Sequence, residues 1–476
     1  MAGIISCSGY VPYYRLKRDE ISRAWGSGSM GGEKAVANSD EDSITMAVAA
    51  AANCLQGVDR NSVDRLFFAT TTAPFKEKQC AALIAAAVDL PRSVLTVDLK
   101  GSLRSATTAI KLAMEAIDSG AAKKVLVTAA DSRLGTPNST FEQISGDGGV
   151  ALLLGDSKEA AIRIDGFYSH SDVFTDVWRR DNDFFVQSGE DRFIMSEGYT
   201  RNVTEAVSAT LKRYKLTPAD FTKAIFYTPD SRAIYNVAKS LGFDAQKQLP
   251  DPLFTTVGNT GTAYALMMLA KYLESAKPGE RSLLVSYGDG CDVFILSTTE
   301  QIDGVRKKIG MDHHIAVKKD LNNYETYLRF RNILAGQMAA RSPEVAYLPA
   351  VWRDQEQLLR FHALKCRHCG TEQFPRERVC YVCHTRDQFD EVRLSDKVGK
   401  VFVYSVDYLS ASLNPPTPVG VIEFEGGCRF YGMMTDCESG EVELGMSVVP
   451  TFRKLHEAAR VHNYYWKCQP VRRMIP

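Results

Sequence analysis

The sequence lacks a long hydrophobic run and an excess of one charge. No apolar stretch approaches the ~18–20 residues of a membrane-spanning helix, and the first charged residues follow the N-terminal apolar stretch, which is not the layout of a signal peptide. Lysine plus arginine and aspartate plus glutamate number 57 each, without long blocks of one sign. This balance argues against nucleic acid or a membrane surface as a partner. We therefore expect a cytoplasmic protein that acts on small molecules.

The sequence also has few histidines and few cysteines that lie close together in the chain. Only four of the eleven cysteines lie in close pairs, and the other seven are scattered. A disulfide framework is therefore not expected, and a reducing compartment is. None of the eight histidines lies in the glycine-rich motifs discussed below, which argues against a Ser/His hydrolase. A chain of 476 residues, 45% of them hydrophobic, is long enough for two or three domains.

The first three hundred residues repeat their own pattern of strands, turns and helices. The matching segments are 61–91 with 217–243, 95–131 with 253–290, and 146–154 with 288–296. Continuous apolar runs at 125–130 and 283–286 are typical of strands buried on both faces. The repeat predicts two α/β halves in tandem, whose helix N-termini can converge on one cleft and favour negative charge there.

Several motifs together carry a resemblance to a known family. They are "ISGDGGVALLLGD", "DVWRRDNDFF", "GNTGTAYALMMLA" and "SYGDGCDVFIL". On these motifs residues 1–303 resemble the thiolase superfamily, and specifically its hydroxymethylglutaryl-CoA synthase branch. The resemblance implies a duplicated, five-layered αβαβα fold. It also implies a usually dimeric enzyme that binds acyl-CoA and makes or breaks carbon–carbon bonds beside the thioester.

The resemblance also implies where the reactive residues should lie. The place of the family's acyl-accepting cysteine falls on Leu103, with Ser102 beside it. The place of the family histidine falls on Tyr227, and that of the synthase glutamate falls on Thr71. Asn259, in the "GN" turn, alone keeps the family's residue type. Leucine cannot form an acyl-enzyme, so covalent acyl transfer through this position is excluded in this register.

Chemistry without an acyl-enzyme is therefore the preferred hypothesis. Thiolase-fold aldolases that use tyrosine in place of the thiol resemble this pattern. Retro-aldol cleavage of a β-hydroxy- or β-oxoacyl-CoA, or its reverse, needs a base and donors for the enolate oxygen. Tyr227 could be the base if nearby positive charge lowers its pKa of about 10, and Asn259 could be the donor. Arg104 could bind a carboxylate or phosphate, or lower the Tyr227 pKa.

Two alternatives stay open from the sequence. The first is an acyltransferase like hydroxymethylglutaryl-CoA synthase or thiolase that uses another thiol, such as Cys291. Free cysteines, however, are more often small buried hydrophobes. The second alternative is a non-catalytic scaffold subunit, since a fold does not imply a function.

The C-terminal third differs from the rest of the chain in composition and sequence pattern. A charged, helix-prone stretch at 304–346 is interpreted as a connector. Cys366, Cys369, Cys380 and Cys383 form two CxxC pairs ten residues apart, a pattern that favours a structural tetrahedral Zn²⁺ site. We predict a zinc ribbon with a preceding helix at 347–392 and a small OB-type β-barrel at 393–476. Ribbon and barrel resemble a thiolase-associated protein that is thought to bind or channel acyl-CoA.

Overall fold

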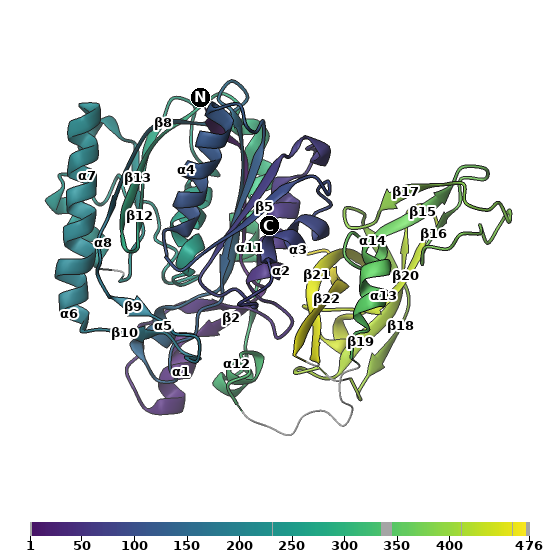
Figure 1. Cartoon of the computed structure of the whole chain (residues 1–476). Coiled ribbons are helices and arrows are strands. Elements are labelled where there is room, and N and C mark those ends of the chain that lie inside the picture. Colours follow the sequence, from purple (N-terminus) through teal and green to yellow (C-terminus); the bar gives the residue numbers. More distant parts are fainter. Residues whose placement is uncertain (1, 231, 335–344, 411, 459, 473–476) are drawn as a thin grey trace. The chain divides into compact units, whose positions relative to one another are not determined.

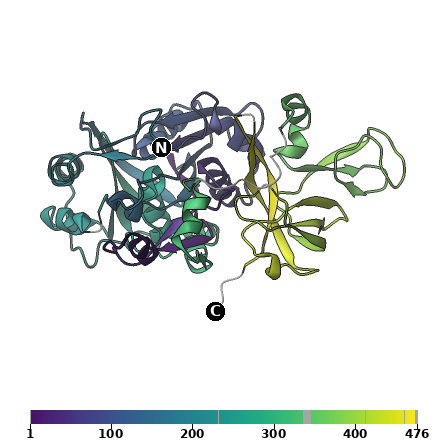
Figure 2. The same cartoon turned by 90° about the horizontal axis from the view of Figure 1, so that it is seen from below.

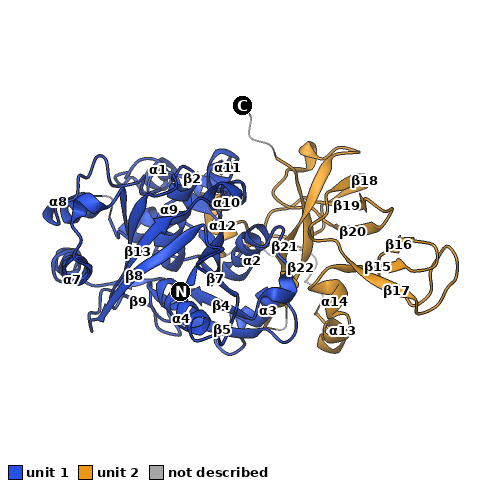
Figure 3. Cartoon of the chain, turned by 90° about the horizontal axis from the view of Figure 1, so that it is seen from above, with its two compact units in different colours: residues 1–37, 42–85, 90–324 blue, residues 38–41, 86–89, 325–476 orange. Residues whose placement is uncertain are grey.

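The computed structural model describes residues 2–230, 232–334, 345–410, 412–458 and 460–472. They form two compact units (Figure 3). Unit 1 comprises residues 1–37, 42–85 and 90–324, and unit 2 comprises 38–41, 86–89 and 325–476. Unit 1 therefore continues past the predicted boundary at 303. Helices α10 (Ile302–Ile309) and α11 (Met311–Ala316), expected in a connector, belong to unit 1, and positions 335–344 of that connector lie outside the described residues.

A nine-stranded sheet forms the centre of unit 1. Its strand order is β11-β12-β13-β8-β1-β7-β6-β4-β5. The bounds are β1 (Ala2–Tyr10), β4 (Arg65–Thr70), β5 (Leu95–Lys100), β6 (Val125–Asp131), β7 (Gly148–Asp156), β8 (Ile162–Ser171), β11 (Lys223–Phe226), β12 (Arg281–Tyr287) and β13 (Gly290–Thr298). Strands β6 and β7 are buried almost throughout, as their apolar sequences predict.

The strand pairing confirms the internal repeat. In the first half β4 runs parallel to β6, and β6 runs antiparallel to β7. In the second half β11 runs parallel to β12, and β12 runs antiparallel to β13. The two halves join where β1 pairs with β8.

One predicted strand is wrong. Residues 253–257, which align with β5, form turns instead. Leu253 has a positive φ of 56°, and its carbonyl oxygen accepts hydrogen bonds from the backbone N–H groups of Val257 and Gly258. These N–H groups are therefore satisfied within the turn and are not available to a neighbouring strand.

Helices cover and separate the two halves of the sheet (Figure 1). Helix α4 (Ser105–Asp118) lies between the halves, and so does α9 (Tyr264–Leu273), which contacts strands of both. Nine of the ten residues of α9 are buried, as a middle layer requires. Helices α2 (Ser43–Cys54) and α7 (Arg201–Tyr214) form outer layers with α3 (Cys80–Ala87) and α8 (Ala233–Ser240). No helix among the described residues is long and apolar enough to cross a membrane.

Unit 1 also contains shorter elements. They are β2 (Tyr14–Lys17), α1 (Arg18–Trp25), β3 (Glu33–Val36), α5 (Thr140–Ile144), β9 (Val177–Trp178), β10 (Gln187–Ser188), α6 (Asp191–Phe193) and β14 (Lys319–Asp320).

Unit 2 is built on two antiparallel sheets (Figure 2). The five-stranded sheet has the order β20-β19-β18-β21-β22, and the three-stranded sheet has the order β16-β15-β17. Its elements are α12 (Tyr324–Phe330), α13 (Leu348–Arg353), α14 (Gln355–Leu358), β15 (His362–Cys366), β16 (Glu372–Gln373), β17 (Phe389–Arg393), β18 (Gly399–Asp407), β19 (Thr417–Phe424), β20 (Arg429–Met433), β21 (Ser447–Ala458) and β22 (Val461–Pro470). The OB assignment of the larger sheet stays a prediction.

A buried charged network holds part of unit 2 together. The carboxylate of Asp40 accepts hydrogen bonds from Lys467 Nζ at 2.8 Å and from Thr435 Oγ1 at 2.8 Å, and pairs with Arg453 Nη1 at 3.3 Å. Arg453 also pairs with Glu41 at 2.7 Å and with Asp436 at 2.6 Å. Its side chain is 1% exposed, so these ions depend on each other for solvation.

Candidate active site and metal centre

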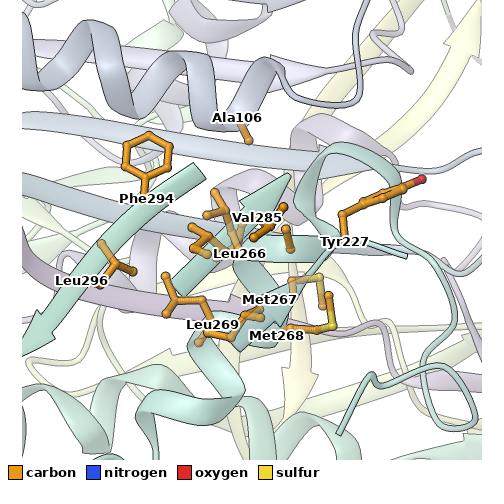
Figure 4. Packing of buried hydrophobic residues seen from close by; sticks show 14 of the residues in the cluster. Ala106, Tyr227, Leu266, Met267, Met268, Leu269, Val285, Phe294 and Leu296 are labelled. Carbon is orange, nitrogen blue, oxygen red and sulfur yellow. The ribbon is translucent and has the colours of Figure 1, made fainter. Parts of the chain in front are cut away.

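Tyr227 follows the last residue of β11, the strand at one edge of the sheet. Its backbone N–H donates to Val285 on the neighbouring β12 at 2.8 Å. The residue is 3% exposed, and its ring packs edge-on against Tyr264 and tilted against Tyr287. Figure 4 shows the ring at the edge of the apolar cluster, with its hydroxyl pointing away from the other labelled side chains. The hydroxyl is thus a polar group at the edge of an apolar core.

Asn259 holds this hydroxyl in place. Its Nδ2 donates to Tyr227 Oη at 3.1 Å and to the Thr228 carbonyl oxygen at 3.0 Å. Its Oδ1 accepts from the Gly261 N–H at 2.9 Å. The structure therefore brings together two of the residues that the sequence selected. Both amide hydrogens of Asn259 are engaged, so its geometry suits the orientation of Tyr227 more than the expected role of an oxyanion donor.

The electrostatic setting of Tyr227 differs from the expectation. Burial raises the pKa of its phenol, and this effect outweighs the charge of Arg133 and the Asn259 hydrogen bond, which lower it. The lowered pKa that the base hypothesis required is therefore not found.

The turn before α4 contains Ser102, Leu103 and Arg104. Leu103 is 7% exposed and belongs to the same buried cluster as Tyr227. Ser102 Oγ donates to the Gly288 carbonyl oxygen at 3.3 Å. Arg104 pairs with Asp292 at 3.0 Å and also donates to serines of β8. The Arg104 guanidinium is therefore occupied by the protein itself.

The candidate thiol of Cys291 is a poor nucleophile here, and so is the thiol of Cys80 at the start of α3. Cys291 is fully buried on β13, and burial, with the charge of Asp292, raises the pKa of its thiol well above the ordinary value. Burial likewise raises the pKa of Cys80 to about 11. Because the thiolate is the reactive form, neither sulfur is activated.

Sequence reasoning missed two carboxylates of the site. Asp131, at the end of β6, accepts hydrogen bonds from the Thr71 N–H at 2.7 Å and from Thr71 Oγ1 at 2.9 Å. Asp176 is 8% exposed, hydrogen-bonds to the Tyr287 hydroxyl, and has a pKa that burial raises. The ends of parallel strands meet at one sheet edge, so the "TAAD" strand end beside the "FFATTT" strand end was the available signal for Asp131.

The four predicted zinc ligands meet in two matching knuckles. Sulfur–sulfur distances are 3.6 Å for Cys366–Cys383 and for Cys369–Cys380, and one atom from each of the four residues lies within 4.8 Å of the others. In both knuckles the N–H of the first cysteine donates to the carbonyl oxygen five residues later at 2.9 Å. Tetrahedral thiolates around a metal at ~2.3 Å lie ~3.8 Å apart, so the geometry fits.

Known proteins resemble a large part of this chain. Family models of 3-Oxoacyl-[acyl-carrier-protein (ACP)] synthase III and of its C terminal part match residues 97–173 and 211–297. A hydroxymethylglutaryl-CoA synthase of Methanocaldococcus jannaschii is 31% identical over 342 residues, which cover 70% of this chain and 99% of that protein. The chain belongs to the hydroxymethylglutaryl-CoA synthase family. A family member from Caldivirga maquilingensis is 32% identical over 343 residues, covering 70% of this chain and 98% of that protein.

Solved structures share the fold of a large part of this chain. A structure of HMG-CoA synthase complexed with CoA has a TM-score of 0.63 at 18% identity, covering 72% of this chain and 95% of that one. MvaS in complex with 3-hydroxy-3-methylglutaryl coenzyme A has a TM-score of 0.62 at 22% identity, covering 72% and 94%. These matches confirm the thiolase-like α/β fold that the motifs predicted.

Proposed function

We propose that the chain is an acyl-CoA-dependent carbon–carbon bond enzyme that works without an acyl-enzyme. The preferred reaction is retro-aldol-type cleavage of a β-hydroxyacyl-CoA or β-oxoacyl-CoA, or its reverse. One observation carries the proposal: the turn where relatives in the resemblance hold their thiol contains Leu103, and the polar group of the site is instead Tyr227, held by Asn259. Relatives named for CoA chemistry support the substrate class.

For a β-hydroxyacyl-CoA the reaction needs proton transfer and no covalent intermediate. The Tyr227 phenolate takes the proton from the β-hydroxyl, whose electron pair forms the new carbonyl. The Cα–Cβ bond breaks, and its electron pair makes the thioester an enolate. Tyr227 then returns the proton to Cα, which yields the shortened acyl-CoA and restores the phenolate. Atoms and charge balance without a further reactant.

Incubation with a series of β-hydroxyacyl-CoA thioesters tests this proposal. We expect a shortened acyl-CoA and a carbonyl product in equal amounts from the intact protein. Tyr227→Phe keeps the ring in the core, so it should abolish cleavage while leaving CoA binding intact, whereas Cys291→Ser should keep activity. Full activity of Tyr227→Phe would remove that residue from the mechanism.

The second candidate is an acyltransferase that resembles hydroxymethylglutaryl-CoA synthase and uses another thiol, such as Cys291. The identity to proteins of that name favours it. A covalent acyl adduct, lost in Cys291→Ser, would support this candidate over the aldolase. Turnover only after addition of a second protein would instead support the scaffold subunit.

The remaining assignments belong to the same proposal. Cys366, Cys369, Cys380 and Cys383 bind one structural Zn²⁺, which stabilises the fold of the ribbon and takes no part in the reaction. The protein forms a homodimer through the thiolase-like domain, and coenzyme A enters only as part of the substrate. Neither nucleic acid nor a membrane is a partner, in line with the balanced charge.

A further inference from the structure

Arg133 is a buried cation that has no counter-ion within the described part of the chain. The residue is 7% exposed, and its guanidinium lies over the Phe141 ring at 4.7 Å. Among the residues that the structure describes, Arg133 makes no hydrogen bond and no ion pair. Buried arginines are ordinarily paired, because an uncompensated buried charge is costly. An unpaired one beside a reactive group therefore points to an anion that forms during the reaction.

The neighbouring carboxylate does not neutralise Arg133. Asp131 lies two residues earlier, but hydroxyl and amide donors surround its oxygens. The Oδ1 atom accepts from Thr70, Thr71 and Thr72, and Oδ2 accepts from Thr71 and Thr262. The threonines stabilise the Asp131 charge, and the guanidinium keeps its own charge available.

Gly261 connects this cation to the Tyr227 hydroxyl. A Cβ atom at position 261 would lie 2.8 Å from Arg133 Cδ, so the arginine stem packs directly on this glycine. The Gly261 N–H donates to Asn259, whose amide in turn donates to Tyr227 Oη. The charge of Arg133 also acts on Tyr227, because it lowers the pKa of the phenol against the effect of burial. Arg133, Asn259 and Tyr227 therefore share one site.

Asn259 cannot supply the oxyanion donor without giving up a hydrogen bond, since Tyr227 and Thr228 occupy both of its amide hydrogens. Arg133 has five N–H donors and no described partner for them. Charge-assisted donors preorganised in a dry site are the strongest stabilisers of a developing oxyanion.

We propose that Arg133 is the anion-binding catalytic residue of this site, where its guanidinium pairs with the Tyr227 phenolate and then with the thioester enolate oxygen. The inference rests on the proposed function for its second half. In the cleavage described above, the negative charge starts on Tyr227 and ends on the thioester oxygen when the Cα–Cβ bond breaks. One fixed cation beside both oxygens stabilises the charge at each stage.

Fluorotyrosine placed at position 227 tests the first half without any substrate. Fluorination lowers the phenol pKa into the range where the protein is folded, and fluorine NMR reports this one ring. We expect Arg133→Gln to move the ionisation midpoint upward by about one to two pH units, and Arg133→Lys to move it less. Arg180→Gln is the matched control, since it removes an exposed arginine paired with Asp183, and should leave the midpoint unchanged.

Kinetics test the second half. Arg133→Gln should lower kcat for cleavage by ~100-fold or more, with KM little changed. An unshifted phenol midpoint in correctly folded Arg133→Gln, or in Arg133→Lys if the glutamine variant does not fold, overturns the inference. A shifted midpoint in a protein that cleaves no thioester supports the pairing of Arg133 with Tyr227 and rejects the proposed function alone.

Discussion

Tyr227 has a buried ring and a hydroxyl that Asn259 orients. The burial of this hydroxyl determines the pH dependence of the proposed reaction. Burial raises the pKa of the phenol, and only the phenolate can accept the β-hydroxyl proton. We therefore expect kcat/KM for cleavage to rise with pH through neutrality into the alkaline range. Tyr227→Phe should lose ~100- to 10,000-fold in rate. A pH–rate profile measures both, and a profile that falls above neutral pH would contradict the assignment.

Single residues were predicted where the family resemblance places them. Tyr227 and Asn259 were selected because they fall on the places of the family's histidine and asparagine, and a 3.1 Å hydrogen bond joins them. The partners of Arg104 could not be predicted, because Asp292 is almost two hundred residues away and reaches it only through the strand order. Arg133 was not selected, because its side chain packs on Gly261, which lies on a distant segment of the chain.

The turn that contains Gly261 shows how an element positions the site. Gly261 has a φ of +61°, and a Cβ there would lie 2.5 Å from Asp131 Oδ2 and 2.8 Å from Arg133 Cδ. We expect Gly261→Ala to destabilise the protein by roughly 3 kcal/mol and to abolish activity, because strain and a clash add. Thermal unfolding measures the change in stability.

Gly279→Ala is the control for this prediction. Gly279 has a φ of +84° but no atom within 4 Å of the added Cβ. Gly279→Ala should lower the free energy of unfolding by only about 1 kcal/mol and leave activity unchanged, because it adds backbone strain without a clash. Equal effects of the two substitutions would show that the close approach at Gly261 is unimportant.

The two cysteine knuckles are the second element with a direct test. Removal of the metal leaves four thiols together with little apolar core around them, so the ribbon should lose its structure. We expect one zinc ion per chain by elemental analysis, lost in Cys380→Ser together with amide protection in β15 and β17. Cys437→Ser, outside the cluster, should keep the metal. Full protection in metal-free protein would contradict a structural role.

Elements were predictable where local pattern decided them. The repeat of apolar strands and small-residue turns gave both halves of the sheet, and the CxxC spacing gave the knuckles. The strand expected at 253–257 does not form, because a turn satisfies backbone N–H groups of this segment locally. The sequence "LFTTV" does not reveal this turn.

At the scale of the whole molecule, segments distant in sequence act as one unit. The segments 38–41 and 86–89 belong to unit 2, although unit 1 surrounds them in the sequence. Hydrophobic patterning could not reveal this, because the contacts of Asp40 with Lys467 and Arg453 join charged residues that are far apart in the sequence. The predicted boundary near 303 was based on a change in composition, whereas unit 1 extends to residue 324.

The Asp40 network predicts the acid stability of unit 2. Burial acts to raise the pKa of Asp40, but the charges of Lys467 and Arg453 outweigh it and hold the value at about 2. A lowered pKa stabilises the fold above the unfolded value of about 3.9 and is lost as pH falls through the folded value. Wild type should therefore lose about 2 kcal/mol between roughly pH 4 and pH 2.

Acid unfolding curves of wild type and two variants check this prediction. Asp40→Asn should be less stable at neutral pH, because Lys467 and Arg453 keep buried charges with one partner fewer, and its stability should fall less on acidification. Asp183→Asn removes an exposed carboxylate paired with Arg180, and solvent screening should make its effect small. Parallel acid curves for wild type and Asp40→Asn would exclude the network as the cause.

The central claim is carbon–carbon bond chemistry without an acyl-enzyme, and the mass of the intact protein tests it most directly. The protein is mixed with an excess of a β-hydroxyacyl-CoA that it turns over, quenched in acid during turnover, and weighed by mass spectrometry. We predict an unmodified chain alongside accumulating products. A chain heavier by one acyl group, with the added mass mapped to a cysteine, would contradict the account.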